Sequence, residues 1–515
     1  MSMMKRTGTC VSLLVMAVGV PTGVVGMERL DDQEMSDVQG QRGVTLELSA
    51  QANVGTFSYF DDGNGIHLDN VSVGSASTPG EGDFQSYAVD LENDGSMNID
   101  FDIEDQRVAV EGVRFDDSNG KSMGSFWMDR NMEGNFRITP GGALSADGYT
   151  FDTNFTMTDG RFGFATNGQQ IFMDDVSMTV NSVGQTLDVQ DNKIIYSAPV
   201  DGNLNIGAIR FAEQAQLFRG DASSLASFGR IEFDFDFETD LEIQAGGRFD
   251  EEGFRIDSDT QLNTASFLYK TNGNSLALNN MSGQSTVTDL RIDVAPDFTS
   301  EGRQGLGFTL SGSDAKASGN LSIGSVELGG TGSIGSVNLE WLFKDQTVNG
   351  ETFSNQMFLM AGGNAVAGPE GMRIANEWSL ADAQLGYTTN GNKVIFDGIQ
   401  SVGRGDVTLD VTSEETLNGT QFFGGLRVGF EDFSGEFHMD GIRLGDESAE
   451  LQGGAELLGI PRSFEFGQLD GHFTMAPGGP DGEGITINSD IVIQDGQIGT
   501  LTEDSGQGIW ADDLD

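Results

Sequence analysis

The sequence predicts an all-β protein built as an elongated antiparallel β-repeat array. Two linked glycine-containing patterns recur five times, apolar and polar residues alternate along many segments, and long helical periodicity is missing. A chain of 515 residues has room for about three domains or one long array. Tandem β-sandwiches and one continuous curved sheet both satisfy these observations.

The first pattern is a glycine followed by an apolar residue, then Thr or Arg, then a second apolar residue. Successive copies begin 105, 105, 118 and 113 residues apart. The five copies are Gly43-Val-Thr-Leu46, Gly148-Tyr-Thr-Phe151, Gly253-Phe-Arg-Ile256, Gly371-Met-Arg-Ile374 and Gly484-Ile-Thr-Ile487. Self-similarity of this kind is typical of repeat architectures.

The second pattern is a turn glycine that follows the first glycine by 20 residues in four copies and by 22 in the fifth. An Asp/Asn pair, Asp-Gly in the fourth copy, comes shortly after it. Asn-Gly and Asp-Gly favour the positive φ angles of tight hairpin turns, so each copy predicts a β-hairpin. The copies are Asp62-Gly63 with Asp69-Asn70, Asn167-Gly168 with Asp174-Asp175, Asn272-Gly273 with Asn279-Asn280, Asn390-Gly391 with Asp397-Gly398, and Ser505-Gly506 with Asp512-Asp513.

Alternation is clearest between Ile231 and Ile243, where apolar side chains occupy nearly every odd position and carboxylates occupy the even ones. Such a strand places one face on an apolar core and the other face in water. Buried parallel strands are apolar on both faces, so these strands are expected to be antiparallel. The acidic outer face would also discourage aggregation at strand edges.

The repeats divide the chain into seven segments. One short helix is expected between Glu28 and Val38, because Leu30, Met35 and Val38 have helical spacing and Gly40 follows as a stop. The segments are a signal peptide at 1–26, an N-terminal family element at 27–42, β repeats at 43–147, 148–252, 253–370 and 371–483, and a partial β repeat at 484–515.

The first 26 residues are typical of a secretory signal. Lys5 and Arg6 precede an apolar run that includes Cys10, and small residues lead to a cleavage point after Gly26. The run is too short to span a bilayer, and we expect no transmembrane segment after signal removal. Cys10 is the single cysteine, so the mature chain is expected to hold no disulfide. The predicted location is outside the cytoplasm, in the periplasm, on the outer-membrane surface or in the extracellular medium.

The charge balance disfavours nucleic acid and anionic lipid as partners, because both need Lys and Arg to displace their counterions. The chain has 80 acidic and 27 basic residues, which gives a formal net charge of −53. Nucleic-acid binding depends on Lys and Arg to replace the counterions of the phosphates, so no nucleic-acid partner is expected.

The segment after the signal resembles a known family. Leu30-Asp-Asp-Gln-Glu-Met-Ser-Asp-Val-Gln-Gly-Gln-Arg-Gly43 runs into an expected strand, and the similarity continues through Val54–Tyr59, Gly65–Gly74 and Asn98–Ile103. Over about residues 27–115 the chain resembles the mature start of a bacterial exported family of unknown function that includes pilus-system FilA-like proteins. The resemblance implies a bacterial surface or envelope protein linked to a fibre or biofilm, and it carries over no catalytic residue.

Calcium is the ligand that the many carboxylates suggest. Asp90–Gly95 fits the first half of an EF-hand loop, but Phe101 stands where the bidentate Glu is needed. The metal candidates that remain are the turn carboxylates Asp61, Asp62, Asp69, Asp174 and Asp175. The alternative is that Asp and Asn occupy these corners because they tolerate turn geometry, and the Asn279-Asn280 copy favours that alternative.

Other chemistry finds less support in the sequence. Gly330-Thr-Gly-Ser-Ile-Gly335 matches a dinucleotide-binding pattern, but a strand rather than a helix is expected after it. The three histidines, His67, His438 and His472, share no repeat position and no metal-ligand spacing. We therefore expect no enzymatic activity, no catalytic residue and no cofactor other than calcium.

The leading hypothesis is a non-enzymatic, exported bacterial protein with a structural role at the cell surface or in the envelope, associated with pili or adhesion. Its expected partners are other envelope or fibre proteins, or further copies of itself. The alternative is a ligand-binding β module that takes calcium, a glycan, or a lipid along a curved apolar sheet face.

Overall fold

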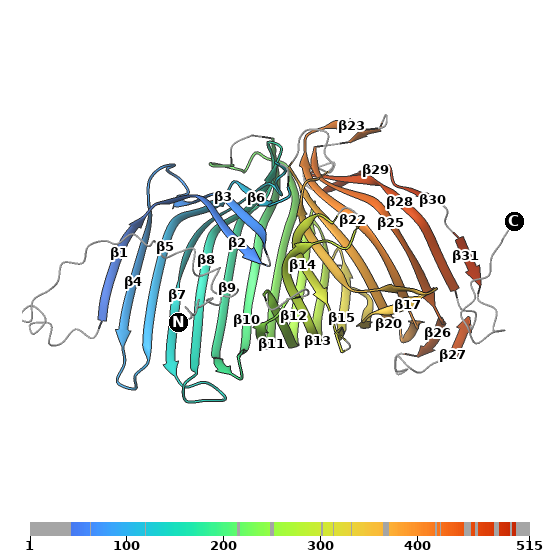
Figure 1. Ribbon diagram of the computed structural model, residues 1–515, viewed down its shortest axis with the longest axis horizontal. Helices are drawn as coiled ribbons and strands as arrows, with labels where there is room; N and C mark the ends of the chain where they lie inside the picture. Colours follow the sequence, from blue (N-terminus) through green and yellow to red (C-terminus); the bar gives the residue numbers. More distant parts are fainter. Residues whose placement is uncertain are drawn as a thin grey trace, which may run out of the picture.

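The computed structural model shows a single, strongly curved sheet (Figure 1). The residues that it describes are 43–61, 63–118, 120–213, 217–247, 252–299, 302–312, 314–330, 332–363, 370–417, 420–422, 424–446, 455–458, 462–477, 484–494 and 497–500. Within these residues 27 strands belong to one sheet, and every strand pairing is antiparallel. The all-β prediction is confirmed, in its continuous-sheet form.

Long strands form the main ladder, and they lie side by side in chain order, from blue at one side of Figure 1 to red at the other. They are β1 (Gly43–Ala50), β4 (Asp83–Leu91), β5 (Met97–Val110), β7 (Ser125–Pro140), β8 (Tyr149–Thr166), β9 (Gln169–Gln190), β10 (Lys193–Glu213), β11 (Ser227–Ala245), β12 (Phe254–Thr271), β13 (Asn274–Pro296), β15 (Lys316–Leu328), β16 (Ser333–Phe343), β20 (Met372–Thr389), β22 (Gln400–Thr412), β25 (Gly425–Met439) and β28 (Arg462–Pro477).

Shorter strands extend this ladder. One group lies where strands from the beginning of the chain contact strands from its middle. It comprises β2 (Ala52–Asp61), β3 (Asn64–Ser75), β6 (Gly112–Phe115), β14 (Gln304–Leu310) and β19 (Gln356–Ala361). Another group follows β20 and β28: β21 (Asn392–Asp397), β26 (Gly441–Asp446), β27 (Ala455–Leu458), β29 (Ile485–Ser489), β30 (Val492–Gln494) and β31 (Gln497–Thr500). Two separate hairpins are β17 (Gln346–Val348) with β18 (Glu351–Phe353), and β23 (Glu415–Leu417) with β24 (Thr420–Phe422).

The turn glycines of the second sequence pattern lie where hairpins were predicted. Positive φ angles are found at Gly63, Gly168, Gly273 and Gly391. The residues that precede the last three glycines, Asn167, Asn272 and Asn390, also have positive φ. A two-residue turn with both φ angles positive matches the twist of the strands that it joins. The hairpin prediction is therefore confirmed for these four copies, and Ser505-Gly506 lies outside the described residues.

The Asp/Asn pairs mark a different feature, the β-bulge. In each described copy the second residue of the pair is left-handed: Asn70, Asp175, Asn280 and Gly398 have φ between 49° and 61°. At Asp175 and Asn280 the strand register shifts, so an extra residue is accommodated there. A bulge bends the strand and increases its twist, which is why the sheet curves instead of lying flat. Asp512-Asp513 lies outside the described residues.

The repeated glycines of the first pattern lie at strand beginnings. Gly43 opens β1, and Gly148, Gly253, Gly371 and Gly484 directly precede β8, β12, β20 and β29. Three of them also close loops that share the same hydrogen bond. In each loop the first residue of a Gly-Gly pair donates its N–H to the carbonyl of the repeat glycine. These bonds join Gly141 to Gly148 (2.8 Å), Gly246 to Gly253 (3.2 Å) and Gly362 to Gly371 (2.7 Å).

Each of these loops folds over a buried aspartate of a neighbouring strand: Asp188, Asp293 or Asp410. A Cβ atom on the repeat glycine, or on the second glycine of the Gly-Gly pair, would collide with that carboxylate, so glycine is required there for the close approach. Burial raises the pKa of Asp188, but hydrogen bonds from the loop, chiefly the Leu144 and Ser145 N–H groups, outweigh it and lower that pKa below its ordinary value.

The sheet closes on itself at one place. β6 contacts β19, and β22 contacts β8 and β9. Val113, Phe115, Met123, Val294 and Ala361 form a buried apolar cluster there. Polar contacts also join β8 to β22. Thr166 Oγ1 donates to the Val411 carbonyl (2.9 Å) and accepts from the Val411 N–H (2.7 Å).

Away from this closure the apolar face is only partly buried. Phe233, Phe235 and Phe237 of β11 stack along one face and remain partly exposed. The core expected against this face is only partial here, because a single-layer sheet supplies no second layer to cover it. The acidic alternate positions of the same strand line the opposite face, as predicted.

Two predictions lie outside the described residues, namely the signal peptide at 1–26 and the short helix at Glu28–Val38. The described part of the chain holds no helix with the length and apolar character that a membrane crossing requires.

Candidate functional site

The site is an apolar pocket on the partly exposed apolar face of the sheet. Its volume is about 530 Å³, within the range of small-molecule sites. It is lined by Val108 and Val110 of β5, Phe126 and Met128 of β7, Phe162 and Phe164 of β8, Ile171 and Met173 of β9, and Ile209 of β10, with the neighbouring Trp127, Gly163 and Phe172.

Strand register explains why these side chains meet. Val108 pairs with Met128, Met128 with Phe162, Phe162 with Met173, and Met173 with Ile209. Directly paired residues point to the same face, so they form one apolar row across five strands. Val110, Phe126, Phe164 and Ile171 form a second row next to it, with the Phe126 and Phe164 rings 5.0 Å apart.

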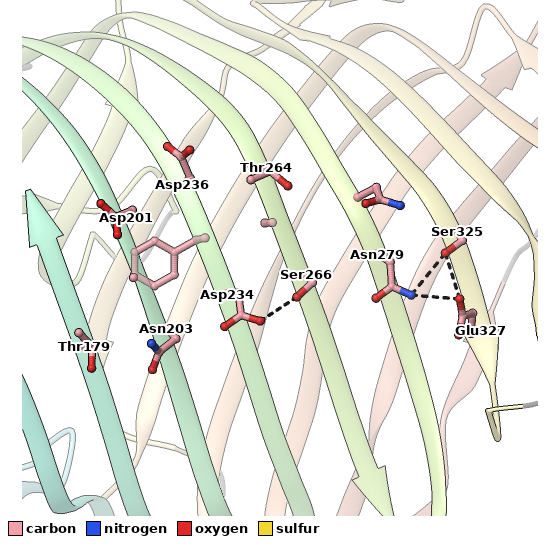
Figure 2. Close-up of a pocket in the computed structure, with 14 residues that line it drawn as sticks. Thr179, Asp201, Asn203, Asp234, Asp236, Thr264, Ser266, Asn279, Ser325 and Glu327 are labelled. Carbon is pink, nitrogen blue, oxygen red and sulfur yellow. Dashed lines mark hydrogen bonds between the residues drawn. The ribbon is translucent and has the colours of Figure 1, made fainter.

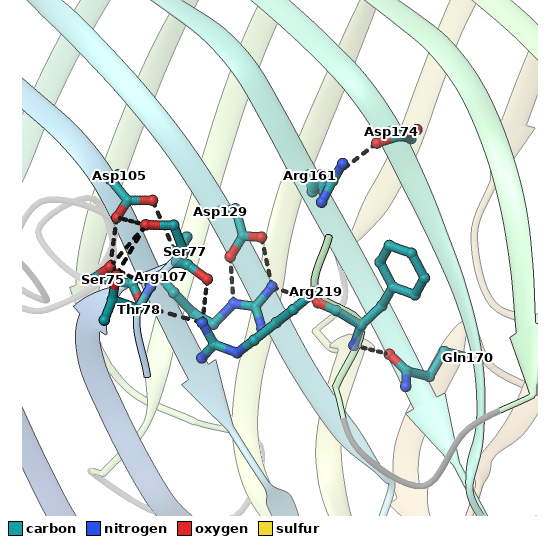
Figure 3. A network of polar contacts seen from close by, with 12 residues as sticks. Ser75, Ser77, Thr78, Asp105, Arg107, Asp129, Arg161, Gln170, Asp174 and Arg219 are labelled. Carbon is teal, nitrogen blue, oxygen red and sulfur yellow. Dashed lines mark hydrogen bonds and ion pairs between the residues drawn. The ribbon is translucent and has the colours of Figure 1, made fainter. Parts of the chain in front are cut away.

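The opposite face of the same strands is covered. Trp127 and Phe172 are buried against Phe218, a residue of the connection between β10 and β11. Figure 3 shows the polar contacts that hold this connection: Arg107 pairs with Asp129 and donates to the Phe218 carbonyl (2.7 Å), while the Phe218 N–H donates to Gln170 (2.9 Å). Arg107 also lies over the Trp127 ring, 4.6 Å from its centroid.

A buried polar set lies next to the pocket on the apolar face. Gln106 is two residues from Val108 on β5, and Arg130 is two residues from Met128 on β7. The Arg130 Nε donates to Gln106 Oε1 (2.7 Å), and the Gln106 amide donates to Asp83. Asp83 also accepts from Gln85 Nε2 (2.8 Å). Asp83, Gln85, Gln106 and Arg130 are between 0 and 7 % exposed.

The predicted calcium candidates of the first repeat lie apart from the pocket. Asp61 is buried and accepts the Val294 N–H (2.9 Å), which ties β2 to β13. Asp69 pairs with Arg114 and accepts from Thr56. The hydrogen bond from Arg114 lowers the pKa of Asp69 against a smaller opposing effect of burial. Asp62 lies outside the described residues.

The candidates of the second repeat also have cationic neighbours. Asp174 pairs with Arg161 (2.7 Å) and Arg210 (2.9 Å), and Asp175 is the left-handed residue of the bulge in β9. Within the described ranges no group of three or more His, Cys, Asp or Glu side chains is placed to hold a metal ion. The structure thus uses Asp61, Asp69 and Asp174 for structural contacts and does not bring them together.

A second, polar depression of about 630 Å³ lies on the acidic face (Figure 2). Asp201, Asp234, Asp236 and Glu327 contribute its carboxylates. Ser266 donates to Asp234 (3.1 Å), and Asn279 donates to Glu327 (3.2 Å). These bonds lie between neighbouring strands, so they stabilise strand pairing whether or not a ligand is present.

Sequence reasoning missed both the apolar pocket and the polar set beside it. One local signal for the polar set exists in β7. Every second residue from Phe126 to Met132 is apolar except Arg130, so the alternation predicts a cation on the apolar face of the strand. The pocket itself depends on rows across five strands, which no local pattern reveals.

Residues 1–105 match the model of a family described as a family of unknown function, DUF6160. The N-terminal part of the chain is thus similar to a family whose function is not known. No curated protein and no solved structure matches the chain.

Proposed function

We propose that this protein is a non-enzymatic, exported protein that binds acyl chains of lipids on the apolar face of its sheet. The observation that carries the proposal is the pair of apolar rows across β5, β7, β8, β9 and β10, which line a pocket and stay partly open to solvent. Contiguous exposed apolar surface is costly in water and is typical of ligand or partner sites.

An acyl chain fits this surface better than a compact polar ligand. The lining side chains are aliphatic, aromatic and thioether groups, which gain free energy from covering CH₂ groups at about 0.8 kcal/mol each. The apolar alternation continues along β11 and its partners, so the surface extends beyond the pocket itself. A glycan would need several hydrogen-bonding groups, and Trp127 is the one lining residue with a side-chain N–H or O–H.

Replacement of Phe162 by Asp is expected to weaken binding of a fluorescent fatty-acid probe by roughly ten- to hundredfold, because one aromatic contact of about 1.5–3 kcal/mol is lost and a charge enters the apolar row. Titration of the purified full chain with the probe measures the effect. Phe84→Asp is the matched control, since Phe84 is 42 % exposed and lies away from the pocket.

Far-UV circular dichroism establishes that both variants keep the strand content of the parent. The proposal is wrong if the unmodified protein binds no acyl probe, or if Phe162→Asp and Phe84→Asp bind it equally well.

A structural role at the bacterial cell surface or in the envelope is the second candidate, and the acidic face favours it. Carboxylates line that face of β11 at Glu232, Asp234, Asp236, Glu238, Asp240 and Glu242. Repeated like charge keeps a long sheet hydrated and disfavours uncontrolled edge pairing. Association with pili or other fibres rests on the resemblance of the N-terminal part alone.

Cell fractionation tests the location that both candidates require. We expect the mature protein, shortened by about the length of a signal peptide, in the envelope or the medium, with surface labelling to distinguish exposed from periplasmic protein. Detection of unprocessed protein in the cytoplasm alone would contradict both candidates.

A further inference from the structure

The buried arginine beside the pocket forms no ion pair with any residue that the structure describes. Arg130 is 7 % exposed, and its only hydrogen bond within the described residues runs from Nε to the neutral side chain of Gln106. Its two terminal nitrogens therefore keep their donors available, and no carboxylate forms an ion pair with it there. A buried guanidinium without an anion is costly, so such an arrangement calls for an explanation.

A bulge in β8 lies opposite Arg130. Asp129 pairs with Arg161 and Asn131 with Thr158, so the register shifts between them and two residues of β8, Asp159 and Gly160, stand opposite Arg130. The Asp159 carboxylate accepts a hydrogen bond from Asn131 (3.4 Å), and Gly160 has no side chain. On the β5 side the residue paired with Arg130 is Gln106. Arg130 thus lies between Gln106 of β5 and the bulge of β8, next to the apolar row that contains Met128.

Asp83, which acts on Arg130 electrostatically, does not form an ion pair with it. Asp83 accepts hydrogen bonds from the Ala50 N–H (3.1 Å), Gln85 and Gln106, which occupy its oxygens. Burial lowers the pKa of Arg130, and electrostatic interactions with Tyr87 and Asp83 oppose that change only in part. An anion against the terminal nitrogens would favour the charged guanidinium.

We propose that Arg130 binds the carboxylate of a long-chain fatty acid whose hydrocarbon chain lies in the apolar pocket. The two terminal nitrogens present the parallel donors that a planar carboxylate accepts. Met128 and Val108 place the first apolar row directly beside this head-group position. A single cation close to Asp83 suits a monoanion better than a doubly charged phosphate ester.

This inference rests on the proposed acyl-chain binding and adds the choice of head group. The test compares cis-parinaric acid with its methyl ester on the purified full chain. We expect the acid to bind roughly tenfold more tightly than the ester, because only the acid carries a charge for Arg130. Replacement of Arg130 by Met should abolish this difference, so that acid and ester bind alike.

Arg137→Met is the matched control. Arg137 lies on the same strand but on the opposite face, where it pairs with Glu92 and Asp94. This variant should keep the preference for the acid. If Arg130→Met does not fold, Arg130→Gln, which retains a polar group, replaces it, and it should likewise lose the preference.

The outcomes separate the two proposals. An unchanged preference for the acid in the Arg130 variants, or equal binding of acid and ester to the parent protein, would overturn the head-group site and leave acyl binding in place. Failure of the parent to bind either probe would overturn both.

Discussion

Replacement of Arg107 by Ala is expected to lower the free energy of unfolding by about 3–5 kcal/mol, the typical cost of breaking a buried ion pair. Arg107 is 3 % exposed and Asp129 is 7 % exposed, so the carboxylate would remain buried without its cation. The variant also loses the hydrogen bond to the Phe218 carbonyl, which anchors the connection over Trp127 (Figure 3). Denaturant unfolding followed by tryptophan fluorescence measures the loss.

Arg137→Ala is the control for this effect. Its partners Glu92 and Asp94 are about half exposed, and surface pairs of this kind contribute about 0–1 kcal/mol. A double variant, Arg107→Met with Asp129→Leu, should recover much of the stability, because no uncompensated charge is then buried. Equal losses for Arg107→Ala and Arg137→Ala would show that the connection between β10 and β11 is not held as described.

Replacement of Gly163 by Ala is expected to destabilise the protein by about 1–3 kcal/mol, which is the usual cost of adding an atom to a well-packed site. Gly163 lies directly across from Trp127, and a Cβ atom there would overlap the indole ring. Trp127 is 3 % exposed and packs on Phe172, with the rings 5.7 Å apart, so it has little room to move.

The matched control is Gly55→Ala, since Gly55 also lies within a strand. A Cβ atom at Gly55 would have no atom within 4 Å, so we expect stability to be unchanged or slightly increased. Thermal unfolding of both variants measures the contrast. A Gly163→Ala variant as stable as the parent would mean that Trp127 does not rest on this glycine.

Glycine and aromatic residues recur together in this way across the sheet. Trp341 covers Gly319, Trp378 covers Gly403, and Phe358 covers Gly307, each on the paired strand. The 73 glycines of the chain are therefore not only turn residues. Many of them leave space for a large ring from the next strand, which composition alone does not reveal.

Local chemistry made much of the fold predictable. Asn-Gly pairs such as Asn167-Gly168 favour positive φ wherever they occur, so the hairpins can be located from the sequence. The alternation at Ile231–Ile243 likewise separates an apolar face from an acidic face without knowledge of any neighbour. The Asp/Asn pairs were recognised as repeated features, but as turn or metal-binding residues, because a bulge appears only when the paired strand is known.

The metal candidates show the same limit. Asp61 meets Val294, which is 233 residues away, and Asp174 meets arginines of β8 and β10. Their sequence context is that of an acidic turn, which suits a cation ligand and a structural contact equally well. Only the partners distinguish these roles, and the partners come from other strands.

By itself the sequence determined the all-β class, the hairpin turns and the two-sided character of the strands, because φ preferences and side-chain alternation are local properties of the chain. The tertiary structure decided that the strands form one continuous sheet, that its apolar face stays partly open, and that Arg130 lies beside the pocket without an ion pair to any described residue. These features depend on which residues face each other across neighbouring strands, and one bulge shifts that pairing for every residue beyond it.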